Sequence, residues 1–369
     1  MKEISLNEYY NKVHGSWLGR VIGDFVGGPI EFLPYSYIKK KYGDLNYYPK
    51  EVDLSKVNDD EMYEICALLA FEKRGIDLTA NDIAKAWIQY LYRDMYTAEK
   101  RAFKNLKAGI FPPESGKVNN IFYDAIGAQM RADIFGQIAP GCPKIAMNYA
   151  KMDGSISHDG IGIEGEIFVA ILVSQAFFEN DIRQNIESAL NIISEERETL
   201  YSRMIRKSIE IFEKYPEDFH EGRKELIKYW HRIRRRELVR KEKQLSERRV
   251  KFLNRIISGV HVLPNAGIIV LSLLYGAKDK ADPLGRSVCI SAMMGLDTDC
   301  NCGNVGAILG AQLGADKIPK KWVEPLKNTF NTYIKGHEHW KIDELAKRVV
   351  NIGKQVIKMK CNDFIKLME

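Results

Sequence analysis

Two short acidic clusters carry the residue types in this chain best suited to hydrolytic chemistry. The first contains Asp59 and Asp60, within residues 58–61 (NDDE), and the second contains Asp297 and Asp299, separated by one threonine. Each cluster stands directly before a run with helical spacing, which predicts that each lies at a helix N-terminus, where free N–H groups and the helix dipole favour negative charge. Helix capping needs one carboxylate, and each cluster offers two.

Gathered carboxylates repel one another unless a cation lies between them. Oxygen ligands without a nearby histidine favour Mg²⁺, Mn²⁺ or Ca²⁺ over zinc. Cys300 and Cys302 keep zinc under consideration, but one Cys-x-Cys pair lacks the second pair or histidine of a structural zinc site. Four carboxylates are enough for two ions about 3.5 to 4 Å apart, and such a pair orients a substrate and activates water. Hydrolysis is the reaction class that this set favours.

Two glycine series repeat every four residues, a spacing that places them on one side of a helix. They are Gly15, Gly19, Gly23 and Gly27, and Gly306, Gly310 and Gly314. A glycine inside a helix costs about 1 kcal/mol relative to alanine, so close approach of another backbone is the expected compensation. If the two helices cross antiparallel, Glu31 meets the cluster around Asp297. The alternative is tight helix packing without any chemistry.

Hydrophobic residues recur with a period near 3.6 along almost the whole chain, and alternating β-type runs are hard to find, which predicts an all-α protein. Proline and glycine cluster between the periodic runs, and no Ser-, Gly- or Pro-rich linker separates two units. We therefore predict a single domain over residues 1–369, with a basic helical insertion at about 231–258.

That insertion holds eleven Lys and Arg residues against three Glu. Such a segment suits a phosphate-bearing partner, so residues 232–255 are a possible nucleic-acid contact. Charge runs are more often the solvated face of an amphipathic helix, and we favour that interpretation.

No run of 18 to 20 apolar residues is present, which argues against a membrane span. The first eleven residues have no apolar stretch of the kind found in secretory signals, so the expected location is cytoplasmic. The six cysteines are scattered along the chain, which suits reduced thiols.

Several segments, in the same order, resemble the ADP-ribosylglycohydrolase family, which includes dinitrogenase-reductase-activating glycohydrolases and ADP-ribosylarginine and ADP-ribosylserine hydrolases. The resemblance covers residues 15 to about 325. It lies in residues 15–32 (GSWLGRVIGDFVGGPIEF), 58–61, 127–131 (GAQMR), 155–168 (SISHDGIGIEGEIF), 261–276 and 295–310 (GLDTDCNCGNVGAILG).

The resemblance implies a large orthogonal helical domain with a magnesium site in a cleft, holding two ions, with Mn²⁺ as an alternative. Its implied metal ligands are Asp59, Asp60, Asp297 and Asp299, and its implied catalytic residues are Glu31, Asp60 and Asp299. The residues implied to border the substrate are Gly127, Arg131 and His158.

The implied activity is hydrolysis of the glycosidic bond at the distal ribose of an ADP-ribosyl adduct, on a protein or a small molecule, with a metal-bound water as the nucleophile. Two alternatives stay open. One is an ADP-ribose or nucleic-acid binding protein of weak catalytic activity, and the other is a metal-dependent hydrolase of another N-ribosyl small molecule.

Four positions bear on these implications. Asn58 and Glu61 depart from the family's Thr-Asp-Asp element, and Cys300 stands where a hydroxyl residue commonly completes the second metal shell. A thiol is a poor magnesium ligand. Arg131 has the alternative role of holding its loop through carboxylate contacts.

Overall fold

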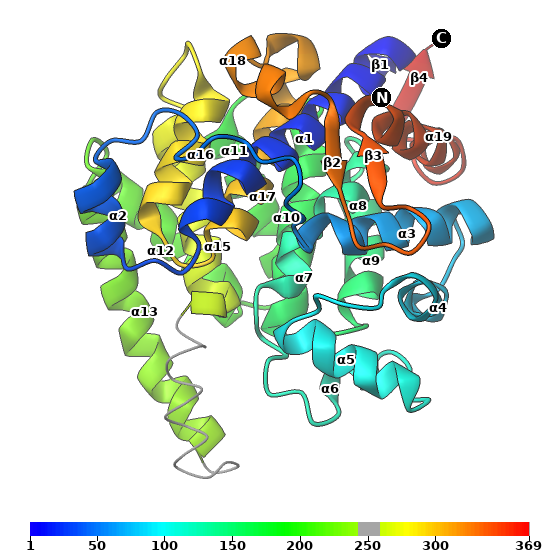
Figure 1. The fold of residues 1–369 in the computed structure, drawn as a ribbon, viewed down its shortest axis with the longest axis horizontal. Helices are drawn as coiled ribbons and strands as arrows, with labels where there is room; N and C mark the ends of the chain where they lie inside the picture. Colours follow the sequence, from blue (N-terminus) through cyan, green and yellow to red (C-terminus); the bar gives the residue numbers. More distant parts are fainter. Residues whose placement is uncertain (243–258, 369) are drawn as a thin grey trace.

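The computed structural model describes residues 1–242 and 259–368, and the fold is the all-α architecture that the hydrophobic periodicity predicts (Figure 1). Its helices are α1 (Leu6–Gly27), α2 (Tyr35–Tyr42), α3 (Asp60–Arg74), α4 (Ala80–Tyr90), α5 (Thr97–Lys107), α6 (Glu114–Lys117), α7 (Gly127–Met130), α8 (Asp133–Gln137), α9 (Pro143–Gly154), α10 (Ile161–Ala176), α11 (Ile182–Ser194), α12 (Leu200–Lys214), α13 (Phe219–Glu242), α15 (Val262–Gly276), α16 (Pro283–Met294), α17 (Thr298–Leu313), α18 (Lys320–Val323) and α19 (Ile342–Lys360). Short 3₁₀ turns cover Gly28–Ile30, Ala315–Lys317 and Glu324–Leu326.

Helices α1 and α17 form the central pair of the fold and contain the two glycine series. A Cβ added to Gly19 lies 2.5 Å from the carbonyl carbon of Gly306, and one added to Gly27 lies 2.6 Å from the Cα of Asp299. The start of α1 therefore lies against the end of α17, and the end of α1 against its start. The two helices thus cross antiparallel, the condition under which the sequence placed Glu31 beside the second cluster, and glycine is required because the two backbones touch.

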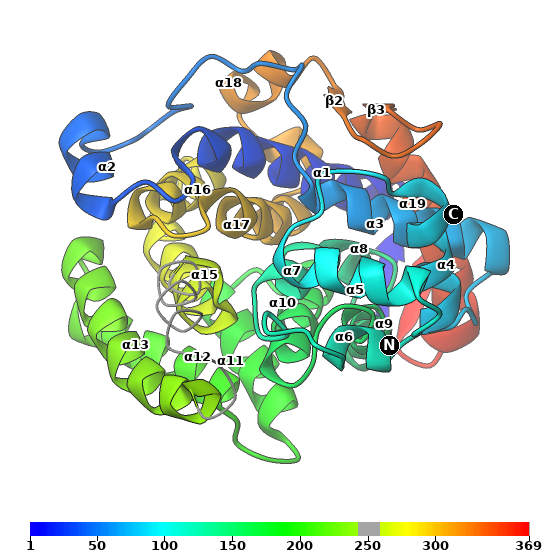
Figure 2. The same cartoon turned by 60° about the horizontal axis from the view of Figure 1, so that its bottom comes forward.

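Mostly apolar helices surround this pair. Helix α10 packs against α7, α8 and α9, while α15 packs against α12, α13 and α16. Every residue of α15 is buried, which explains why its sequence is apolar on all sides. Figure 2 shows α12 and α13 outside α15 and α3 to α6 on another side of the molecule. The second acidic cluster lies at the start of the central helix α17, and the first lies at the start of α3.

The structure adds four short strands that the periodicity did not predict. Strand β1 (Lys2–Ser5) pairs in parallel with β4 (Ile365–Met368), with Lys2 opposite Ile365. Strand β2 (Thr329–Asn331) pairs antiparallel with β3 (His339–Lys341). Each strand has three or four residues and buries one of them, which is too short for an alternating pattern to stand out.

The predicted basic insertion begins within α13, and residues 243–258 lie outside the described part of the chain. The single domain, the insertion and the nucleic-acid contact at residues 232–255 therefore stay predictions. None of the described helices has both the length and the apolar character needed to cross a bilayer. All six cysteines are unpaired and buried, as expected for reduced thiols.

Candidate active site

The two acidic clusters meet where the N-termini of α3 and α17 come together. The Cys300 thiol Sγ, in the first turn of α17, lies 3.5 Å from Oδ1 of Asp60, the first residue of α3. Asn58 Oδ1 accepts a 3.4 Å hydrogen bond from the Asp60 backbone N–H, so this side chain supports the start of its own helix. The structure thus brings together residues about 240 positions apart in the sequence.

The carboxylates at these helix starts do not cap them. Asp59 and Asp297 occupy the N-cap positions of α3 and α17, but neither side chain accepts a capping hydrogen bond from a backbone N–H of its helix. Oδ1 of Asp297 and Oδ1 of Asp299 are both buried and have no hydrogen-bond partner in the described residues. Capping, the structural alternative for both clusters, does not account for these oxygens.

The second cluster has the donors and spacing for a hard cation. One ligand atom each from Asp297, Asp299 and Cys300 lies within 4.8 Å of the others. Burial raises the pKa of Asp297, and the adjacent Asp299 raises it further; burial likewise raises the pKa of Asp299. Two buried carboxylates, each with one oxygen that has no partner, fit a divalent cation with oxygen ligands. The Cys302 thiol instead donates to the Val288 carbonyl at 3.3 Å, so the Cys-x-Cys pair does not form one site.

Glu31 follows the 3₁₀ turn at the end of α1 and is held beside the second cluster by backbone contacts. The N–H of Phe32 donates to the Leu296 carbonyl at 3.0 Å, and the Thr298 hydroxyl donates to the Gly27 carbonyl at 2.8 Å. Phe32 and Leu296 both have positive φ, 53° and 71°, a strained conformation that persists where the surrounding fold enforces it. Burial and then Asp299 raise the pKa of Glu31 to about 8.

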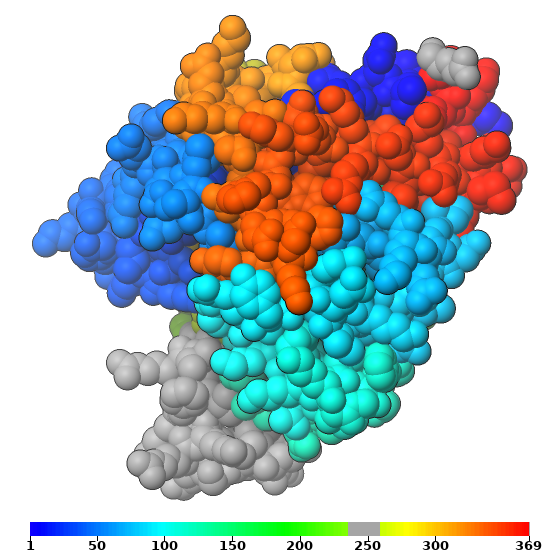
Figure 3. Space-filling view, turned by 45° about the vertical axis from the view of Figure 1, so that its right-hand side comes forward, coloured from blue at the N-terminus to red at the C-terminus, as the bar shows by residue number. Residues whose placement is uncertain are grey.

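Asp59 connects the acidic centre to an open pocket of about 210 Å³, whose walls include Arg93, Tyr96 and Tyr333. Part of Asp59 is exposed, yet packing around its carboxylate raises the pKa, and Asp299 raises it further. The Arg93 guanidinium lies 4.1 Å from the centre of the Tyr333 ring, and Tyr96 is 55% exposed. Figure 3 shows the orange surface near β2 and β3 meeting the cyan surface of the residues that precede α5.

Arg131, one of the residues expected near the substrate, lies in the interior. Its guanidinium donates to Asp153 Oδ2 at 2.6 Å, Glu99 Oε1 at 2.9 Å and the Ser157 hydroxyl at 2.9 Å. The side chain is 1% exposed, so its donors serve protein groups. These contacts favour the loop-holding role over a phosphate contact.

Gly127 and His158 lie around this same buried network. The Gly127 carbonyl accepts from Arg131 at 3.1 Å, and a Cβ at Gly127 would overlap the carboxylate of Glu99. His158 is fully buried, and its Nδ1 is 2.8 Å from the Ser157 hydroxyl. Burial lowers the pKa of His158 and the nearby Arg131 lowers it further, so the ring is neutral. Among the described residues, neither Gly127 nor His158 forms a hydrogen bond with a carboxylate of the two clusters. The substrate-binding roles of these two residues stay predictions.

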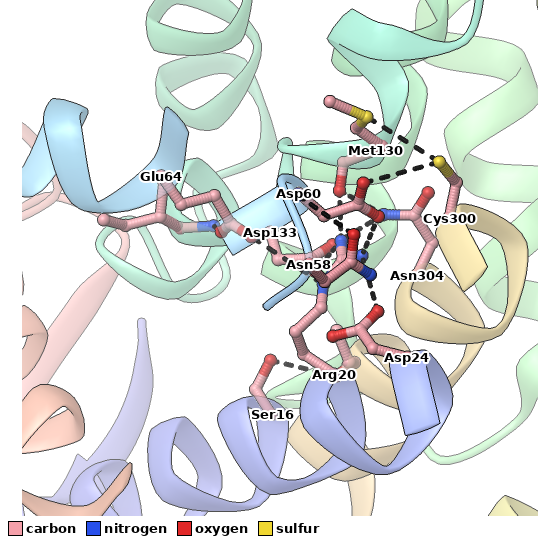
Figure 4. A network of polar contacts seen from close by, with 12 residues as sticks. Ser16, Arg20, Asp24, Asn58, Asp60, Glu64, Met130, Asp133, Cys300 and Asn304 are labelled. Atoms are coloured by element: carbon pink, nitrogen blue, oxygen red, sulfur yellow. Dashed lines mark hydrogen bonds and ion pairs between the residues drawn. The ribbon is translucent and has the colours of Figure 1, made fainter. Parts of the chain in front are cut away.

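The sequence interpretation missed a second arginine, Arg20, on α1. Figure 4 shows its side chain reaching from α1 toward carboxylates on other segments. Its Nε donates to Asp133 Oδ2 at 2.8 Å, its Nη1 lies 3.2 Å from Asp60 Oδ2, and Nη2 donates to the Met130 carbonyl. Asp24 at 3.8 Å and Glu64 at 3.7 Å complete a set of four carboxylates. The sequence did contain one signal for Arg20. It is a charged residue among the glycine and apolar positions of α1, and it stands four residues before an aspartate.

An antiparallel glycine helix pair with carboxylates gathered at one end defines a helical domain built around an acidic centre. Comparison with known proteins identifies it: residues 5–356 match the ADP-ribosylglycohydrolase family, and the chain belongs to that family. An uncharacterized protein of Archaeoglobus fulgidus is 23% identical over 350 residues, covering 93% of this chain and 97% of the relative. A solved ADP-ribosylglycohydrolase-related protein complex shares the fold, with a TM-score of 0.61 and 16% identity over 94% of this chain and 99% of that one.

Proposed function

We propose that this protein is a Mg²⁺-dependent hydrolase that cleaves the glycosidic bond at the distal ribose of an ADP-ribosyl adduct. The observation that carries the proposal is the pair of buried, unpartnered oxygens of Asp297 and Asp299 beside Asp60 and the pocket lined by Asp59. Family membership supports the substrate class and the reaction type.

Asp59, Asp297 and Asp299 are the residues that would hold a divalent ion, and Mn²⁺ fits the same oxygen donors. When bound, such an ion supplies a Lewis acid that orients ribose hydroxyls and makes a water molecule more acidic. Asp60 adds a negative charge beside these three aspartates, and its carboxylate is itself in contact with Arg20.

The residues of the chain supply the remaining chemistry. Glu31, on the rim formed by the end of α1, receives the proton of the attacking water. The water oxygen bonds to the anomeric carbon while the bond from that carbon to the acceptor atom breaks, with positive charge developing on the ribose in between; the acceptor leaves with the proton taken from the water. The gathered buried carboxylates keep the potential negative at the ribose, which stabilises an oxocarbenium-like transition state. Tyr96 offers an exposed aromatic face at the pocket for the rest of the substrate.

The experiment is incubation with ADP-ribosylated arginine and serine peptides, with and without Mg²⁺, followed by measurement of free ADP-ribose. We expect Asp299→Asn to lower activity at least about a hundredfold, because losing one electrostatic contact to the developing charge already costs that much. Asp82→Asn is the matched control, since Asp82 is an acidic residue in the first turn of α4 that receives bonds from Thr79. Equal ADP-ribose release by wild type and Asp299→Asn would contradict the proposal.

A further inference from the structure

Arg20 brings a permanent positive charge into contact with the acidic centre. The arginine is fully buried, and Nη1 lies 3.2 Å from Oδ2 of Asp60. On its other side, Asp133 and Glu64 fix the guanidinium, with Nε 2.8 Å from Asp133 Oδ2 and 3.7 Å from Glu64 Oε1. Because a guanidinium stays protonated in proteins, this charge is present at every working pH.

The space for the guanidinium depends on the facing helix. A Cβ at Gly303, on α17, would lie 2.9 Å from Cζ of Arg20 and 2.6 Å from Oδ1 of Asp24. The missing side chain therefore leaves room for Arg20 between α1 and α17. Carboxylates on one side and backbone on the other keep the arginine against Asp60.

The oxygens of the acidic centre fall into two groups. Both oxygens of Asp60 have partners, because Oδ2 faces Arg20 and Oδ1 lies 3.5 Å from the Cys300 thiol. That thiol also lies 3.7 Å from the Met130 sulfur. By contrast, Oδ1 of Asp297 and Oδ1 of Asp299 are buried without a partner.

We propose that Arg20 serves as a built-in cation that neutralises Asp60, so that the centre binds one divalent ion, at Asp297, Asp299 and Asp59, instead of two. This inference rests on the metal site of the proposed function and deepens it. It changes the expected role of Asp60 from a metal ligand to the partner of Arg20.

Charge and ligand chemistry both argue against a second ion at Asp60. An ion there would lie a few ångströms from the guanidinium in a site with little water, where like charges repel strongly. It would also be next to the sulfur atoms of Cys300 and Met130, which are poor ligands for hard cations. Asp297 and Asp299 also have the Cys300 thiol within 4.8 Å. Neither of them is paired with Arg20 in the described residues, however, and Oδ1 of each has no partner there.

The test is the number of ions bound by the full-length chain, measured by equilibrium dialysis against Mn²⁺ with metal analysis and by electron paramagnetic resonance of the bound ion. Wild type is expected to bind one Mn²⁺, and Arg20→Ala two. Arg131→Ala is the matched control and is expected to bind one, because Arg131 is also a buried arginine with carboxylate partners, Glu99 and Asp153.

Asp60→Asn keeps the inference testable if Arg20→Ala does not fold. We expect Asp60→Asn to bind one Mn²⁺ with an affinity within a few-fold of wild type, since the oxygens of Asp60 are occupied by Arg20 and Cys300. Two ions in wild type, or loss of the ion in Asp60→Asn, would overturn the inference and leave the proposed function standing. No bound ion in wild type would overturn both.

Discussion

Replacing Gly19 with alanine tests whether the contact between α1 and α17 holds the two acidic clusters together. The added Cβ lies 2.5 Å from the carbonyl carbon of Gly306, whereas carbon atoms in contact are about 3.5 to 4.0 Å apart. The obstacle is backbone, which no rotamer change can move. The helices must therefore separate by about 1 Å.

The expected loss of stability follows from two opposing effects. Overpacking of a tight core costs about 1 to 3 kcal/mol, and a clash with backbone belongs at the upper end of that range. In the opposite direction, alanine in place of glycine inside a helix stabilises the helix by about 1 kcal/mol. We therefore expect Gly19→Ala to lower the free energy of unfolding by about 2 kcal/mol.

Urea unfolding followed by circular dichroism measures this change, and Gly28→Ala is the matched control. Gly28 has a φ of −54°, and a Cβ there meets nothing within 4 Å, so its substitution is expected to be neutral or slightly stabilising. Separation of α1 from α17 also moves Glu31 away from Asp299, so Gly19→Ala should bind Mn²⁺ more weakly than Gly28→Ala. Equal stability and equal affinity of the two variants would refute the reasoning.

Two further predictions concern proton linkage and substrate binding. Because the pKa of Glu31 is raised to about 8, the metal-free carboxyl retains its proton at pH 7, and an ion bound beside it displaces that proton. Mg²⁺ affinity should therefore rise from pH 6 to 8 and level off above pH 8. Calorimetry in buffers of different ionisation enthalpy measures both the affinity and the proton released on binding. An affinity that does not change with pH, with no proton released, would contradict this prediction. Tyr96→Ala should raise KM for an ADP-ribosyl peptide about fivefold with a smaller effect on kcat, since an aromatic contact contributes on the order of 1 kcal/mol; an unchanged KM would exclude contact between Tyr96 and the substrate.

The features that the sequence predicts well depend on short spacings. The glycine repeat in α1 and α17 and the acidic residues at the starts of α3 and α17 are local patterns, and each indicates its own helix. Close contact between the two helices also follows, because backbone contact is the compensation for a row of glycines, whereas the glycine spacing is the same for a parallel and an antiparallel pair. The pairing of Glu31 with Asp299 then depends only on chain direction.

The features that the sequence does not predict depend on which distant side chain fills a given space. Arg131 has the same residue type whether it binds phosphate or carboxylates, and only the fold places Asp153 and Glu99 around it. Likewise, nothing near Arg20 in the sequence indicates Asp60 or Asp133, which are 40 and 113 residues away. Long-range charge pairing has no periodicity from which it can be predicted.

Helix α1 determines the positions of both acidic clusters, by two different interactions. Its glycine face fixes α17, and therefore Asp299, by backbone contact. The residue after Gly19 is Arg20, which projects from the helix beside that face and fixes the start of α3 through Asp60. Packing of the glycine face sets the distance from α1 to the second cluster, and the charge of Arg20 sets the distance from α1 to the first. A shift of α1 along its axis would therefore displace the two clusters relative to each other. A buried arginine between two contact glycines therefore has a structural reason that is independent of any bound ion.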